Sequence, residues 1–171
     1  MFTNKFATRL NSFKSNWRNE TKPTTRDLVE RASKVEGLTH VDLNYPDHSE
    51  PSIREISAIT NDCGLEINGL AMRYYTNPAF KLGAFTNPNK QVRQEAIYLT
   101  KAAIDALREI DSNLLTIWLG QDGFDYGFQV DYKKIWDDEI NAIKEIAEHD
   151  KECLVSIESV SYTHLTLPTK A

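Results

Sequence analysis

The sequence predicts an α/β fold in which helices cover a parallel sheet, as in part of an eight-stranded (β/α)8 TIM barrel. Strand-like and helix-like segments alternate along the chain, and the strand-like segments are apolar over most of their length. This pattern favours a parallel sheet with right-handed crossovers. No glycine-rich turn follows the first strand-like segment, which argues against the main alternative, a dinucleotide-binding doubly wound sheet.

About five strands and four helices are expected. Short runs of strand-forming residues predict strands over 5–10, 38–43, 66–72, 114–118 and 153–157. Apolar residues spaced three or four apart, together with N-cap and glycine stop signals, predict helices over 24–36, 52–63, 90–110 and 132–149. Five strands within residues 1–158 match the spacing of a barrel of about 250 residues or more, so these residues predict the N-terminal part of one.

Composition indicates one soluble globular unit, which we expect to be cytoplasmic. The 171 residues carry a net charge of −5 and are 40% hydrophobic. Basic residues are scattered, so neither nucleic acid nor an anionic membrane is an expected partner. The first residues lack a signal-peptide pattern, and no apolar run is long enough to span a membrane. Cys63 and Cys153 are expected to be reduced thiols.

Residues 159–171 do not continue the pattern. The ten residues 160–169 correspond to an in-frame translation of a transposase-type sequencing adapter, so we interpret 159–171 as a non-native tail and exclude it from the fold. The alternative is a real strand over 162–167, where Thr and Leu alternate. A barrel that stops after five strands leaves an unpaired edge, so we expect this fragment to be inactive by itself.

Two long loops at strand ends are the candidate substrate site. Residues 73–88 and 118–129 would lie at the C-terminal face of a barrel, where long loops are usually functional. Their aromatic and polar composition suits a sugar, whose ring packs on aromatic faces and whose hydroxyls bond polar groups. The candidates are Arg73, Tyr75, Phe85, Trp118 and Gln121. Alternatively, the aromatic side chains only cap the rim of the barrel.

Glu158 is the candidate metal ligand. It directly follows the last predicted strand, and a carboxylate at the C-terminal end of a buried strand is costly to bury unless a cation or several donors meet it. The alternative partner is a Lys or Arg side chain. Asp42 and Asn44, near the end of the second strand, are further substrate-binding candidates, although both could simply bond the following turn. His48 is a minor candidate for proton transfer.

Three segments resemble the xylose-isomerase-like superfamily of TIM barrels. They are residues 75–86 (YTNPAFKLGAFT), 118–123 (WLGQDG) and 157–158 (IE). Xylose isomerases have similar runs in the same order: aromatic-Thr-His-Pro-Val-Phe-Lys-Asp-Gly-Gly-Phe-Thr, Trp-Gly-Gly-Arg-Glu-Gly, and Ile-Glu-Pro-Lys. The resemblance implies that Glu158 is the first ligand of a divalent metal (Mg, Mn or Co), that Trp118 packs on the sugar and that Tyr75 belongs to an apolar pocket. It also implies a homo-oligomeric parent protein.

The implied activity is metal-dependent aldose–ketose isomerisation. Xylose isomerases place a ring-opening histidine near the end of the second strand and a tryptophan after the first, where this sequence has Asp42 or Asn44 and Arg9 or Asn11. A rhamnose-isomerase-like activity therefore fits as well as a xylose-isomerase-like one. A sugar epimerase or an inosose dehydratase of the same superfamily is the alternative. An abasic-site endonuclease is more remote, because the net charge of −5 disfavours phosphate binding.

Overall fold

The computed structural model describes residues 4–15, 17, 21–120, 122–124 and 128–158. These residues form one parallel sheet of five strands in the order β1-β2-β3-β4-β5, so every strand pairs with the next strand of the sequence. The strands are Ala7–Arg9 (β1), His40–Tyr45 (β2), Glu66–Met72 (β3), Leu114–Trp118 (β4) and Leu154–Glu158 (β5). The α-helices are Thr25–Ala32 (α1), Ile53–Asp62 (α2), Lys90–Leu107 (α3) and Tyr132–His149 (α4). The predicted alternation is confirmed.

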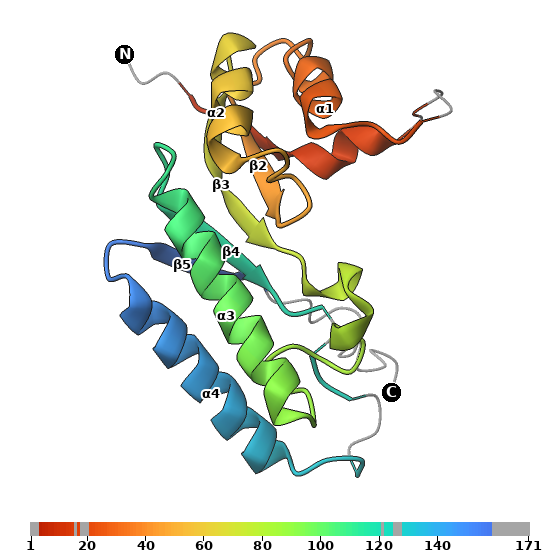
Figure 1. Ribbon diagram of the computed structural model, residues 1–171, viewed down its shortest axis with the longest axis vertical. Coiled ribbons are helices and arrows are strands. Elements are labelled where there is room, and N and C mark those ends of the chain that lie inside the picture. Colours follow the sequence, from red (N-terminus) through yellow and green to blue (C-terminus); the bar gives the residue numbers. More distant parts are fainter. Residues whose placement is uncertain (1–3, 16, 18–20, 121, 125–127, 159–171) are drawn as a thin grey trace, which may run out of the picture.

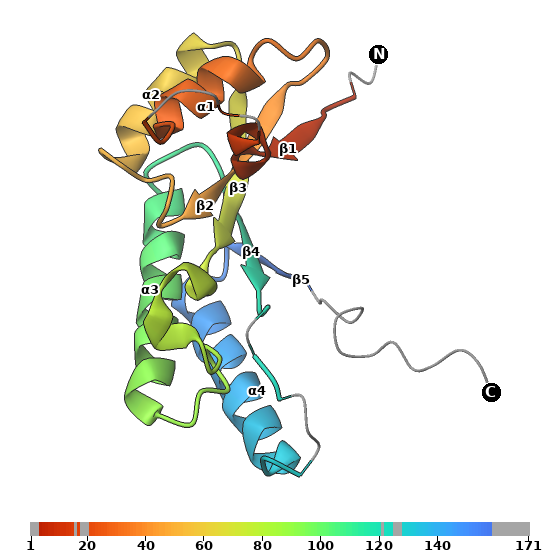
Figure 2. The same cartoon turned by 90° about the vertical axis from the view of Figure 1, so that its right-hand side faces the viewer.

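The four helices lie on one side of the curved sheet, as the outer helices of a barrel do (Figures 1 and 2). The hydrophobic core lies between the helices and this face of the sheet. In β4, for example, Leu115 and Ile117 are fully buried, whereas Leu114, Thr116 and Trp118 are half-buried. Because side chains alternate between the two faces of a strand, Trp118 is on the face that lies away from the helices.

Side-chain caps fix where the helices begin. The Thr24 hydroxyl accepts a hydrogen bond from the backbone N–H of Asp27, and the Asp27 carboxylate accepts one from the backbone N–H of Thr24. Ser52, Asn89 and Asp131 cap the other three helices in the same general way. At the end of α2, Gly64 has a φ of +75°, a conformation that glycine adopts without steric cost.

Several predicted boundaries differ from the structure, and three of the differences have a clear local cause. The segment predicted as strand 5–10 is shorter, because the chain turns at once into a 3-10 helix, η1 (Leu10–Lys14). Strand β2 lies two residues later than predicted, since it stays paired with β3 as far as Tyr45 and Met72. Helix α1 ends at Ala32, where the Ser33 hydroxyl bonds the carbonyl of Glu30.

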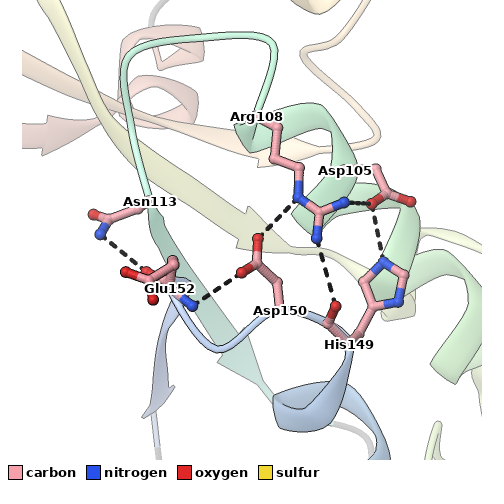
Figure 3. A network of polar contacts seen from close by, with 6 residues as sticks. All are labelled: Asp105, Arg108, Asn113, His149, Asp150 and Glu152. Atoms are coloured by element: carbon pink, nitrogen blue, oxygen red, sulfur yellow. Dashed lines mark hydrogen bonds and ion pairs between the residues drawn. The ribbon is translucent and has the colours of Figure 1, made fainter.

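A polar network joins the helices at the N-terminal end of β4 and β5 (Figure 3). The Arg108 guanidinium, at the end of α3, bonds the carboxylates of Asp105 and Asp150 at 2.9 Å each. His149 bonds Asp105, and Asn113 donates to the carbonyl of Glu152 just before β5. This network ties α3, α4 and the two strands together at the end of the sheet that is used for stability in TIM barrels.

Two other predictions can be compared with the fold. Both Cys63 and Cys153 are free thiols and half-buried. Across the described part of the chain, no helix combines enough length and apolarity to cross a lipid bilayer. Residues 159–171 lie outside the described residues, and so does Gln121.

Candidate functional site

A cleft of about 480 Å³ lies at the C-terminal ends of the strands. Four of the predicted site residues line it: Asp42, Arg73, Trp118 and Glu158. The strand register explains why they meet. Trp118 pairs with Glu158 across β4 and β5, so the two side chains leave the same face of the sheet side by side. The cleft is thus where ligands of parallel α/β barrels bind.

The first strand supplies lining residues that were not among the predicted site residues. Ala7, Thr8, Arg9, Asn11 and Ser12 line the cleft. Arg9 is the last residue of β1, pairs in register with Asp42 and forms an ion pair with Glu158. A charged residue ending the first strand was the available signal. It was missed because the strand was expected to continue to residue 10, which left the functional end of the strand undefined.

Trp118, Tyr75 and Arg73 pack against one another on one side of the cleft. The Trp118 and Tyr75 rings meet edge to face, with centroids 4.9 Å apart. The guanidinium carbon of Arg73 lies 4.7 Å from the Tyr75 ring centroid and 5.3 Å from that of Trp118. Gly120 allows this arrangement, because a Cβ there would lie 2.5 Å from the Trp118 ring. The aromatic side chains therefore hold a cation in place.

Several buried polar atoms around the cleft have no hydrogen-bond partner among the described residues. They are Asn11 Oδ1, Asn44 Oδ1, His48 Nε2 and Arg73 Nε. Asn11, His48 and Arg73 follow the neighbouring strands β1, β2 and β3, and Asn44 is the second-last residue of β2. All four therefore belong to the C-terminal end of the sheet. Because buried polar groups are rarely left unpaired, their concentration here indicates a place for water or a polar ligand.

His48 and Asn44 lie behind the cleft, not in its lining. His48 is 2% exposed, and its Nδ1 accepts a hydrogen bond from the backbone N–H of Asn44. Burial, reinforced by the charges of Lys14 and Arg73, lowers the pKa of His48 to about 4. The ring is therefore neutral at pH 7 and holds the turn that follows β2. The proton-transfer role suggested for His48 stays a prediction.

Phe85 lies in the hydrophobic core rather than in the cleft. Its ring is fully buried and packs edge to face on Tyr74, with centroids 5.4 Å apart. The loop around it is held by Asp122, whose carboxylate accepts hydrogen bonds from the backbone N–H groups of Ala84 and Thr86 and from the Thr86 hydroxyl. This set of contacts, the Asp122 clamp, joins the loops after β3 and β4. The sequence predicts that both loops are functional, but it does not distinguish residues that hold the loops together from residues that line the cleft.

The described residues supply only part of a metal site. Glu158 is half-exposed at the edge of the cleft, as an available ligand would be, but its carboxylate is already paired with Arg9. No group of three or more His, Cys, Asp or Glu side chains in the described part of the chain is arranged to hold a metal ion. Hard divalent metals take several oxygen ligands, so these residues do not form a complete site.

Known proteins resemble the chain in both sequence and fold. It is 26% identical over 92 residues to the xylose isomerase of Thermus thermophilus, and the match covers 54% of this chain and 24% of that protein. A D-psicose 3-epimerase structure in the presence of D-fructose superposes with a TM-score of 0.69 at 16% identity, covering 94% of this chain and 54% of that one. A xylose isomerase domain protein from Alicyclobacillus acidocaldarius gives 0.61 at 10% identity, covering 91% and 50%.

No family model matches the chain. The chain spans about a quarter of its curated relatives in the matched region and about half of the solved structures. Those structures are TIM barrels, and the five strands described above follow the same order of parallel pairing. The chain is therefore similar in sequence to xylose isomerases and shares the fold of xylose-isomerase-like TIM barrels, of which its described residues form five consecutive strands.

Proposed function

We propose that the cleft is part of the active site of a sugar isomerase that interconverts an aldose and a ketose. The observation that carries the proposal is the meeting of Trp118, Asp42 and Glu158 in one cleft at the C-terminal ends of the strands. An aromatic wall beside polar and charged groups suits a polyhydroxylated ligand. The xylose isomerase similarity supports the same class of reaction.

A divalent metal (Mg, Mn or Co) belongs to this proposal, with Glu158 as one ligand. A metal bound there would polarise a substrate carbonyl or hydroxyl oxygen as a Lewis acid. The other ligands would have to come from outside the described residues. Arg9 would then have to release Glu158, which is reasonable because a half-exposed ion pair contributes only about 0–1 kcal/mol.

Epimerisation is the second candidate, favoured by the psicose epimerase structure, whose fold covers most of this chain. Epimerisation inverts one carbon of a ketose and conserves the carbonyl position, whereas isomerisation moves the carbonyl between C1 and C2. The cleft offers carboxylates in Asp42 and Glu158 that could orient hydroxyls in either reaction. The products distinguish the two reactions.

The test is product analysis with the full product of the source gene, beside the 171-residue chain alone. Aldoses and ketoses, including xylose, rhamnose and fructose, are incubated with Mg²⁺, Mn²⁺ or Co²⁺ and analysed by NMR. Aldose–ketose conversion that disappears in Glu158→Gln supports the isomerase, and conversion between ketose epimers supports the epimerase. If the full gene product converts none of these sugars, both the isomerase and the epimerase proposals are excluded. We expect the 171-residue chain alone to be inactive.

For an isomerase, deuterium at C2 of the substrate distinguishes the two chemical routes. Loss of the label to solvent would exclude a hydride shift and indicate proton transfer through an enediol.

A further inference from the structure

Arg73 is held in the cleft by a backbone hydrogen bond and by aromatic contacts, neither of which uses the N–H donors of its guanidinium. Its backbone N–H continues the pairing of β3 by donating to the carbonyl of Tyr45 at 3.0 Å. Its guanidinium packs on Tyr75 and Trp118 at 4.7 and 5.3 Å from the ring centroids. Such cation–π contacts orient a guanidinium plane but leave its N–H donors available.

The other charges of the cleft have partners. Arg9 pairs with Glu158, and Asp42 accepts a hydrogen bond from the Asn68 amide at 2.7 Å. Arg73, in contrast, has no ion pair and no side-chain hydrogen bond to any described residue, and its Nε is buried. Burial is the main reason that the pKa of Arg73 is lowered, and the carboxylates of Asp47 and Glu158 oppose this shift from a distance without an ion pair to the guanidinium.

Other arginines in the chain show what a satisfied guanidinium looks like here. Arg31 donates to the carbonyls of Phe13 and Ser15 at 2.8 and 3.0 Å. Arg93 donates to the carbonyl of Asn87 and pairs with Asp138 at 3.5 Å. Both are used to hold elements of the fold together. Arg73 makes no such contact with the described residues, which leaves its side chain available to a ligand.

The chemistry of the guanidinium restricts that ligand. Arginine presents a planar fork of donors that matches the oxygens of a carboxylate or a phosphate, and such charge-assisted pairs are stronger than bonds to neutral hydroxyls. A neutral sugar would give Arg73 only hydroxyl acceptors. An anionic group would give the Arg73 guanidinium the hydrogen-bond acceptors that the described residues do not provide.

We propose that the substrate of this cleft is a sugar that carries an oxyanion, a carboxylate or a phosphate, and that Arg73 binds this group. The proposal rests on the proposed sugar-converting function and specifies its substrate class. In this arrangement Trp118 and Tyr75 hold the guanidinium so that one end of the sugar is anchored. Asp42 and Glu158 lie in the same cleft and face the remainder of the sugar.

The test compares the affinity of matched charged and neutral sugars by isothermal titration calorimetry. The full gene product, at fixed Mg²⁺, is titrated with D-galacturonate against D-galactose and with D-glucose 6-phosphate against D-glucose. At least one charged sugar should bind about 10- to 100-fold more tightly than its neutral counterpart. The pair that shows the preference distinguishes carboxylate from phosphate.

Variants assign the preference to Arg73. The ratio of charged to neutral affinity should fall to near one in Arg73→Met and be partly kept in Arg73→Lys. It should be unchanged in Arg26→Met, an exposed arginine of α1 that does not line the cleft. Thermal unfolding of each variant shows whether it is folded.

Three results would overturn the inference. Equal affinity for charged and neutral sugars would exclude an anionic substrate while leaving the proposed function intact. A preference that survives in Arg73→Met would show that another residue binds the anion. Binding of no sugar would exclude the proposed function as well as this inference.

Discussion

Arg108 and Arg73 lie at opposite ends of the sheet and have opposite surroundings. Arg108 bonds two carboxylates and a carbonyl at the N-terminal end (Figure 3), and its pKa is raised, chiefly by the hydrogen bond to Asp150. Arg73 packs against two aromatic rings at the C-terminal end, and burial lowers its pKa. The Arg108 guanidinium bonds three acceptors, whereas the Arg73 guanidinium has no hydrogen-bond acceptor among the described residues.

The difference distinguishes polar groups that hold the fold together from polar groups that we propose bind a ligand. A saturated network holds helices and strands together and needs nothing further. Unpaired buried groups lower stability and are retained where a ligand completes them. The C-terminal end contains both kinds, because the Asp122 clamp is bonded whereas four side chains around the cleft each have a buried polar atom without a partner among the described residues.

The largest expected effect comes from removing the clamp. Asp122→Ala leaves the N–H groups of Ala84 and Thr86 without their acceptor in a part-buried loop, so we expect the free energy of unfolding to fall by about 3 kcal/mol or more. Urea unfolding measures it. Asp137→Ala, an exposed residue of α4, is the control and should change stability by less than about 0.5 kcal/mol. A loss below about 1 kcal/mol for Asp122→Ala would show that the clamp is not structural.

Glu139, on α4 near the clamp, should make the protein less stable as pH rises. Burial and the charge of Asp122 raise the pKa of Glu139 from 4.5 to about 7 in the folded state. Between pH 4.5 and 7 the native state therefore binds more protons than the unfolded state, and stability falls. Glu139→Gln should be more stable than wild type by about 1–3 kcal/mol at pH 8, with the gain shrinking toward pH 4.5.

Urea unfolding from pH 4 to 8 measures the Glu139 effect. Glu145→Gln, an exposed residue of the same helix, serves as the control, and its difference from wild type should vary less with pH. A gain for Glu139→Gln that is the same at pH 4.5 and 8 would contradict the assignment.

His48, behind the cleft, should act in the opposite direction. Its folded-state pKa of about 4 lies below the ordinary 6.5, so the unfolded state binds more protons between these values and stability is lost as pH falls from 6.5 to 4. His48→Asn keeps an acceptor for the Asn44 N–H but cannot titrate. As pH falls from 6.5 to 4, the free energy of unfolding of His48→Asn should rise by about 1–3 kcal/mol relative to that of the wild type.

The same unfolding series measures the His48 effect. His149→Asn is the control, because His149 lies at the other end of the sheet in the Arg108 network. A pH-independent difference between His48→Asn and wild type would show that His48 is not buried as a neutral ring.

The smallest effects come from the two arginines themselves. Arg108→Met removes bonded charges and should lower the urea midpoint. Arg73→Met removes an unpaired buried Nε, so stability should stay within about 1 kcal/mol of wild type or increase. Parallel urea titrations of the two variants compare them directly. A larger loss in Arg73→Met than in Arg108→Met would reverse the assignment of structural and functional roles.

Much of the site could be predicted from strand ends. Asp42, Trp118 and Glu158 were identified because polar or aromatic residues that end parallel strands meet at one edge of a sheet, and all three line the cleft. Arg73 was identified from the loop that follows β3. Phe85 could not be separated from them, because an aromatic residue in a long loop has the same local pattern whether it faces a ligand or the core.

Local sequence determined the alternation of strands and helices, because periodicity and caps such as Thr24 and Ser52 act within a few residues. It also placed Glu158 at a strand end. Tertiary structure alone decided which polar groups have partners. The pairing of Arg9 with Glu158 joins residues 149 positions apart, and Asp122 reaches a loop 36–38 positions away. Such contacts depend on the register and curvature of the sheet, which no short stretch of sequence encodes.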